Sequence, residues 1–204
     1  YTRPPGNEGY MGKIFCVMGK SASGKDTIYR RLMEAPGLGL ERIVLYTTRP
    51  IREGEAEGRE YHFVDRARYE ALLAAGKVIE ARSYDTMYGV WTYFTAEEGI
   101  DLAKTSYLTI GTLESYEKLK SYFGEKQVVP VYVELEDGER LSRALARERL
   151  QETPRYAELC RRFLADCADF SEEKLAAAGI NRRFVNDDLE RCCGEILRYI
   201  EENK

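Results

Sequence analysis

A phosphate-binding motif lies near the start of the chain, where residues 19–27 read GKSASGKDT. The spacing G-x-x-x-x-G-K, after a short apolar stretch and before a helix-like segment, is typical of loops whose backbone N–H groups surround phosphates. We therefore predict an ATP site in which Lys25 reaches the β- and γ-phosphates. The residues that we assign to ATP in this segment are Gly19, Ser21, Ser23, Gly24, Lys25, Asp26 and Thr27.

Asp26 stands where such loops usually have a serine or threonine that ligates magnesium. It is either an oxygen ligand of Mg²⁺, directly or through water, or an acidic residue favoured in the first turn of a helix. A carboxylate beside a triphosphate is repelled unless a cation lies between them, which favours the first interpretation. We therefore expect Mg²⁺ as cofactor, with ATP as co-substrate and Asp26 as the metal residue, while Thr27 offers a hydroxyl.

Two further groups of basic residues could bind or stabilise phosphate. In residues 46–63, YTTRPIREGEAEGREYHF, Arg49 and Arg52 flank a proline turn and Tyr61 follows, so that all three could converge on one phosphate. In residues 140–150, RLSRALARERL, arginines recur at helical spacing. Each group could instead be a solvated charged surface.

The elements that position these residues follow from short apolar runs at 13–18, 42–47, 107–111, 128–135 and 183–187. Runs of this length alternating with helix-like segments predict an α/β fold with a central parallel sheet flanked by helices. Residues 48–95 differ in pattern and indicate an inserted lobe, whereas the C-terminal third has helical spacing. We expect residues 1–10 to be a flexible leader or a cloning remnant, and residues 11–204 to form a single domain.

Composition limits the classes of partner. The chain has 204 residues and a net charge of -4, so its overall charge attracts neither nucleic acid nor anionic lipid. Its apolar runs are too short to span a bilayer. Five cysteines without a C-x-x-C pair fit free thiols in a reducing compartment, and we expect a cytoplasmic protein that binds small nucleotides. The oligomeric state does not follow from the sequence.

The sequence resembles the guanylate kinase family from about Met11 to Ile200, in the phosphate loop, in TTRPIREGEAEGREYHF, in IEARSYDTMYG and in FVNDDLERC. The resemblance implies a P-loop kinase fold that moves the γ-phosphate of Mg-ATP to a nucleoside monophosphate, with GMP as the expected acceptor. It also implies that residues 48–95 bind the acceptor and that residues 138–165 form a helical lid over ATP.

The resemblance assigns roles to individual residues. For the acceptor it implies Arg49, Arg52, Tyr61 and Tyr88 at the phosphate, Glu80 at the base and Glu55 in the loop that shapes the pocket. For catalysis it implies Lys25, Arg143, Arg147 and Arg162, since phosphoryl transfer needs positioning and cations on the moving group. Asn186 matches a segment near adenine, although a cap between strand and helix explains it equally well.

The chain departs from the family pattern at positions that contact guanine, which here are Leu45, Val90, Thr109 and Gly111. Two alternatives therefore remain. The ribose 1,5-bisphosphate kinases of phosphonate metabolism also have a phosphate loop ending in GKD, and their acceptor has no base. Guanylate kinase-like domains also serve as non-catalytic binding modules, but such a module needs neither Lys25 nor the lid arginines.

Overall fold

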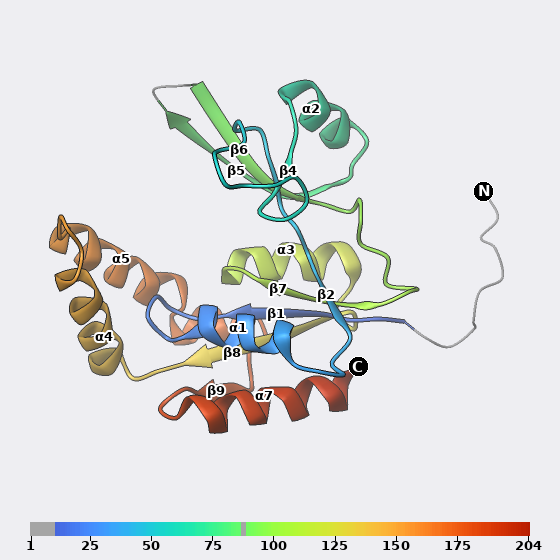
Figure 1. Cartoon of the computed structure of the whole chain (residues 1–204). Coiled ribbons are helices and arrows are strands. Elements are labelled where there is room, and N and C mark those ends of the chain that lie inside the picture. Colours follow the sequence, from blue (N-terminus) through green and yellow to red (C-terminus); the bar gives the residue numbers. More distant parts are fainter. Residues whose placement is uncertain (1–10, 87–88) are drawn as a thin grey trace.

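A five-stranded parallel sheet forms the centre of the protein (Figure 1). A computed structural model describes residues 11–86 and 89–204. The strands, in spatial order, are β2 (Leu40–Arg42), β7 (Ser106–Ile110), β1 (Ile14–Met18), β8 (Val128–Glu134) and β9 (Arg183–Val185). All neighbouring strands run parallel, so their carboxyl ends meet at one edge, where ligands bind in sheets of this kind. The predicted α/β architecture is confirmed.

Helices cover both faces of this sheet. The helices concerned are α1 (Lys25–Glu34), α3 (Leu113–Phe123), α6 (Glu172–Ala177) and α7 (Leu189–Asn203). Successive side chains of a strand point to opposite faces. Ile14 and Cys16 of β1 accordingly pack with α3 and α6, whereas Phe15 and Val17 pack with α1 and α7. Burial on both faces explains why β1 reads as an unbroken apolar run.

The inserted segment forms a second, four-stranded sheet with the order β4-β3-β6-β5. Its elements are β3 (Tyr46–Thr47), β4 (His62–Phe63), α2 (Arg66–Ala74), β5 (Val78–Thr86) and β6 (Gly89–Ala96). A small separate core, built around Leu72 and Phe94, holds α2 against this sheet. We call residues 46–96 the lobe. The sheet begins at Tyr46, two residues before the inserted segment 48–95 that was predicted from the sequence.

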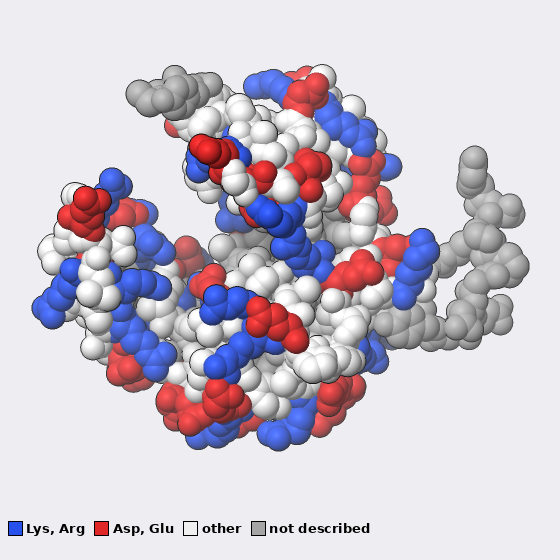
Figure 2. Space-filling model, in the orientation of Figure 1, with Lys and Arg blue, Asp and Glu red and all other residues white. Residues whose placement is uncertain are grey.

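Two helices extend the molecule beside the end of β8 (Figure 1). They are α4 (Asp137–Arg149) and α5 (Tyr156–Asp169), and we call them the lid helices. None of the residues of α5 is fully buried, in contrast to the helices that cover the sheet. Figure 2 shows the surface hollowed between the lid helices, the lobe and the parallel sheet.

One predicted strand is wrong in its extent. The apolar run 42–47 is not one strand, because β2 ends at Arg42 and the chain then leaves the parallel sheet. Tyr46 and Thr47 pair instead with β4 and β6 of the lobe. Residues 1–10 and Tyr88 lie outside the described residues. Among the residues that are described, no helix is long and apolar enough to cross a membrane.

Candidate active site

The phosphate loop follows β1 and depends on its two glycines. A Cβ atom at Gly19 would lie 2.4 Å from the backbone oxygen of Val133 in β8. At Gly24, whose φ is 88°, a Cβ atom would lie 2.2 Å from Nδ2 of Asn186. Both glycines are therefore required by close approach of neighbouring segments, and Gly24 also by its left-handed conformation. The loop is held against β8 on one side and the end of β9 on the other.

The loop has free capacity to bind an anion. Helix α1 starts at Lys25, and no side chain in the described residues caps the N–H groups of its first turn. Such N–H groups, together with the helix dipole, favour bound phosphate. The hydroxyl of Ser23 is buried and has no hydrogen-bond partner within the described residues. A phosphate oxygen at this point would remove the cost of leaving that hydroxyl unpaired.

Asp26 lies in the first turn of α1 with an accessible carboxylate. Its side chain is 83% exposed, and Oδ2 lies 3.5 Å from Nζ of Lys25. Mg²⁺ prefers oxygen ligands and is typically held by one or two carboxylates together with substrate phosphates and water. The carboxylate of Asp26 and the neighbouring hydroxyl of Thr27 fit this requirement beside the phosphate loop. The metal role of Asp26 stays a prediction.

Asn186 is a structural support of the phosphate loop. Its side chain is buried, and Nδ2 donates a hydrogen bond of 2.7 Å to the backbone oxygen of Ser23. The alternative that Asn186 caps a helix is wrong, because Asp188 is the N-cap of α7 and accepts from the N–H of Arg191. Contact between Asn186 and adenine stays a prediction.

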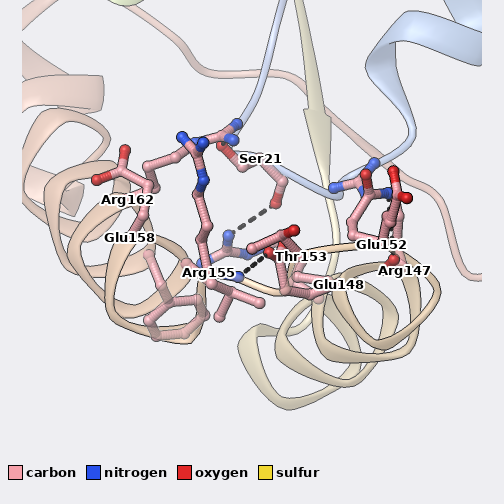
Figure 3. A pocket seen from close by; sticks show the side chains of 13 residues that line it. Ser21, Arg147, Glu148, Glu152, Thr153, Arg155, Glu158 and Arg162 are labelled. Atoms are coloured by element: carbon pink, nitrogen blue, oxygen red, sulfur yellow. Dashed lines mark hydrogen bonds between the residues drawn. The ribbon is translucent and has the colours of Figure 1, made fainter.

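The lid helices and the phosphate loop enclose a cavity of about 710 Å³ (Figure 3). Of the predicted catalytic arginines, Arg147 and Arg162 line it together with Ser21. Figure 3 shows Ser21 between Arg162 and Arg147, which stand at opposite sides of the cavity. Nη2 of Arg162 lies 3.5 Å from Oγ of Ser21. Arg143 is not among the residues that line this cavity, and its Nε donates to Glu139 of the same helix at 3.0 Å.

The lid cavity is also lined by two basic residues to which no individual role was assigned from the sequence. Arg155, at the N-terminus of α5, lines it, and so does the buried Arg140 of α4. In the sequence, the signal for Arg140 was its spacing of three residues from Asp137, which permits a helical ion pair. No comparable signal marked Arg155.

In the lobe, Arg49 is bound by a neighbouring carboxylate. Its guanidinium donates to both carboxylate oxygens of Glu55, at 2.8 and 2.5 Å, and stacks over the rings of Tyr61 and Phe63. These hydrogen bonds from Arg49, with one from the N–H of Arg52, lower the pKa of Glu55 to about 2. Arg49 therefore organises the loop that carries Arg52. A direct contact between Arg49 and a phosphate stays a prediction.

An aromatic cavity of about 460 Å³ opens in the lobe beside this loop. It is lined by Leu45, Tyr61, Arg82, Tyr84, Thr86, Trp91 and Tyr93. The guanidinium carbon of Arg52 lies 5.9 Å from the centre of the Trp91 ring, so that Arg52 also reaches this region. The cavity thus combines flat aromatic walls with the guanidinium group of Arg82, and Arg52 lies near its Trp91 wall, which suits a base and a phosphate.

Glu80, predicted to bind the base, lies next to Arg82. Its side chain is 12% exposed; Oε2 accepts from the hydroxyl of Ser115 at 2.9 Å, and Oε1 accepts from Thr95 at 3.2 Å. Nη2 of Arg82 lies 3.7 Å from Oε1 of Glu80. Ser115 belongs to α3, so Glu80 joins the lobe to the parallel-sheet core. No role for Arg82 was predicted from the sequence.

Comparisons with known proteins relate the chain to one family. The family model described as guanylate kinase matches residues 11–203. The guanylate kinase of Symbiobacterium thermophilum is 33% identical over 198 residues, covering 95% of this chain and 86% of the relative. That of Rhodopseudomonas palustris strain HaA2 is 45% identical over 80 residues, but this match spans only 38% of the chain and 36% of the relative. A crystal structure of guanylate kinase from Anaplasma phagocytophilum has a TM-score of 0.56 at 22% identity, covering 95% of this chain and 86% of that one.

Proposed function

The chain belongs to the guanylate kinase family, and from this premise we propose that it transfers the γ-phosphate of ATP to GMP. One observation carries the proposal: Ser21 of the phosphate loop lines the same cavity as Arg147 and Arg162 of the lid helices. Phosphoryl transfer requires a site that holds the triphosphate and cations that stabilise charge on the moving group. This arrangement supplies both.

On the donor side, the uncapped start of α1 and the hydroxyl of Ser23 bind phosphate oxygens. Lys25 neutralises charge on the β- and γ-phosphates, and Arg147 and Arg162 stabilise the charge that spreads over the γ-phosphoryl group during transfer. Asp26 and the phosphates would hold magnesium, which would supply further charge neutralisation. The role of the protein is therefore to position the reactants and stabilise charge, without a covalent step on a side chain.

On the acceptor side, Arg52 and Tyr61 bind the phosphate of GMP, on a loop held in shape by the Arg49–Glu55 pair. Guanine has donors at N1 and N2 and an acceptor at O6. The carboxylate of Glu80 accepts from the two donors, since each of its oxygens keeps accepting capacity beyond its one hydroxyl partner. Arg82, which lies beside Glu80, donates to O6.

We further propose that the reaction belongs to purine nucleotide metabolism in the cytoplasm. The five cysteines are all free, which fits a reducing compartment. Small nucleotides are the partners that the site requires. The net charge of -4 gives the protein no general attraction to nucleic acid.

A coupled assay of ADP release tests the proposal with GMP, dGMP, IMP, AMP, CMP, UMP and ribose 1,5-bisphosphate as acceptors. The proposal predicts the highest kcat/KM with GMP, because adenine has a donor where guanine has O6 and would face Arg82. The pyrimidines fill less of the aromatic cavity. Turnover with ribose 1,5-bisphosphate but not with GMP would replace the proposed acceptor with a sugar phosphate. Failure with every acceptor would favour a binding module.

A further inference from the structure

Arg140 is a buried charged residue that the proposed reaction does not use. It lies on α4 with 1% of its side chain exposed, and its guanidinium packs 4.6 Å above the ring of Phe163 on α5. Nε and Nη2 donate to Oδ1 of Asp137 at 3.0 and 2.8 Å. Nη1 donates to the backbone oxygen of Ser21 at 2.9 Å. Arg140 therefore connects both lid helices to the phosphate loop.

Asp166 of α5 makes the complementary contact. Its Oδ2 accepts a hydrogen bond of 2.8 Å from the backbone N–H of Ser21, and the same oxygen lies 3.8 Å from Nη1 of Arg140. The N–H and the C=O of Ser21 are thus held by two side chains from two different helices. Both backbone groups of one residue in the phosphate loop depend on the lid helices for their hydrogen bonds.

The charges around this contact are balanced. Nζ of Lys20 lies 3.2 Å from Oδ1 of Asp137, so that two cations and two carboxylates alternate from Lys20 to Asp166. Burial tends to raise the pKa of Asp137, but hydrogen bonds from Arg140 and Lys20 outweigh it and lower the pKa below its usual value. Only Arg140 of the four is fully buried, whereas the side chain of Asp137 is 47% exposed, and ion pairs with such an accessible partner add little to stability. Stability alone therefore does not account for four charged groups in this geometry.

Arg140 and Asp166 lie on the same faces of their helices as the cavity-lining arginines of the lid. Asp166 follows Arg162 by four residues on α5, and Arg147 follows Arg140 by seven residues on α4. Residues at these spacings lie on the same face of a helix. The face of each lid helix that grips Ser21 is therefore also the face that carries a cavity-lining arginine.

We propose that Arg140 and Asp166 are positioning residues that clamp Ser21 and so fix the phosphate loop relative to Arg147 and Arg162. The clamp acts on the bound triphosphate by fixing the loop, since both side chains are hydrogen-bonded to the backbone of Ser21. A displacement of about 1 Å between reacting groups can cost roughly 100-fold in rate, so a fixed relation between loop and lid is of direct value for transfer. The inference concerns the ATP end of the proposed reaction and does not depend on which acceptor is used.

The test compares Asp166→Ala and Asp166→Asn with the matched control Asp169→Ala. Asp169 lies on the same helix, but it is exposed and contacts neither the phosphate loop nor the lid arginines. ADP binding is measured by calorimetric titration, and KM for ATP, KM for the acceptor and kcat are measured separately. Asp166→Ala should weaken ADP binding and raise KM for ATP at least roughly tenfold, and lower kcat, with KM for GMP unchanged.

Asp166→Asn keeps an accepting oxygen and should recover part of the ADP affinity, and the control should match the wild type. A merely structural role gives another pattern: a lower Tm and a smaller active fraction, with both KM values and the ADP affinity unchanged. That pattern, or wild-type behaviour of Asp166→Ala, overturns the proposal. Because ADP titration needs no acceptor, a wild-type protein that ignores GMP refutes the proposed function and leaves this test intact.

Discussion

Replacement of Glu80 by glutamine tests whether the acceptor is a guanine nucleotide. In the structure each carboxylate oxygen of Glu80 accepts from one hydroxyl, of Ser115 or Thr95. If GMP binds here, the same oxygens also accept from N1–H and N2–H of guanine. Glutamine replaces one acceptor with an N–H₂ donor, which then faces a donor of the base. The side chain keeps its size, so the substitution alters the pattern of donors and acceptors rather than the packing.

The expected magnitude follows from these contacts. Glu80 is largely buried, so the N–H group of guanine that loses its acceptor cannot readily turn to water. An unpaired buried group costs about 1–3 kcal/mol, which corresponds to a loss of roughly 5- to 150-fold. We expect Glu80→Gln to lower kcat/KM for GMP at least roughly tenfold. IMP lacks the 2-amino group and makes one contact fewer, so its loss should be smaller.

The assay is the coupled release of ADP at saturating Mg-ATP, with GMP and IMP compared for each variant. Arg52→Ala serves as the contrasting variant. Loss of a residue that binds the phosphate should lower kcat/KM to the same extent for every phosphorylated acceptor. Equal kcat/KM for GMP in the wild type and in Glu80→Gln would refute the reasoning. An equal loss of kcat/KM for GMP and IMP would show that Glu80 does not contact the 2-amino group.

Three further predictions concern the ATP site and the lobe. Lys25→Ala should abolish transfer and leave the circular dichroism spectrum unchanged; near-normal turnover would remove the assignment of the ATP site. Asp26→Ala should raise the Mg²⁺ concentration for half-maximal rate, and Asp26→Ser should partly restore it, whereas an unchanged requirement in both variants reduces Asp26 to a residue of the first helical turn. The pKa of Glu55, about 2, lies below its ordinary value of 4.5, so its pair with Arg49 stabilises the fold fully above about pH 4.5 and progressively less as the pH falls toward 2. The Tm difference between wild type and Glu55→Gln should therefore shrink over this range, and a difference that is constant from pH 6 to pH 2 would contradict the pairing.

The elements that could be predicted are those specified by local pattern. The apolar run of β1, the two loop glycines and the helical spacing of the lid helices each required only neighbouring residues, and each led to the observed element. The prediction of one strand over residues 42–47 failed, because the apolar pattern does not indicate which sheet these residues join. The strand ends at Arg42 because Arg42 pairs with β7 of the parallel sheet, whereas Tyr46 and Thr47 pair with β6 of the lobe.

The candidate site could be predicted in outline but not in its contacts. Arg49 was expected at a phosphate, but charge alone does not decide between an external phosphate and Glu55, six residues away. The clamp on Ser21 joins residues 145 positions apart, and no periodicity or motif connects them. The proposed role of Arg82 in binding the base follows from its position beside Glu80. That position depends on how the lobe packs against α3 and could not be predicted from the sequence.

We propose that the protein transfers the γ-phosphate of ATP to GMP. The most direct test of this transfer follows the phosphate group itself. The protein is incubated with Mg-ATP labelled in its γ-phosphate and with equal concentrations of GMP and ribose 1,5-bisphosphate, and the labelled products are separated. Transfer to GMP predicts GDP labelled in its β-phosphate as the main product. Label found only in inorganic phosphate, or only in a product of the sugar bisphosphate, would contradict the claim.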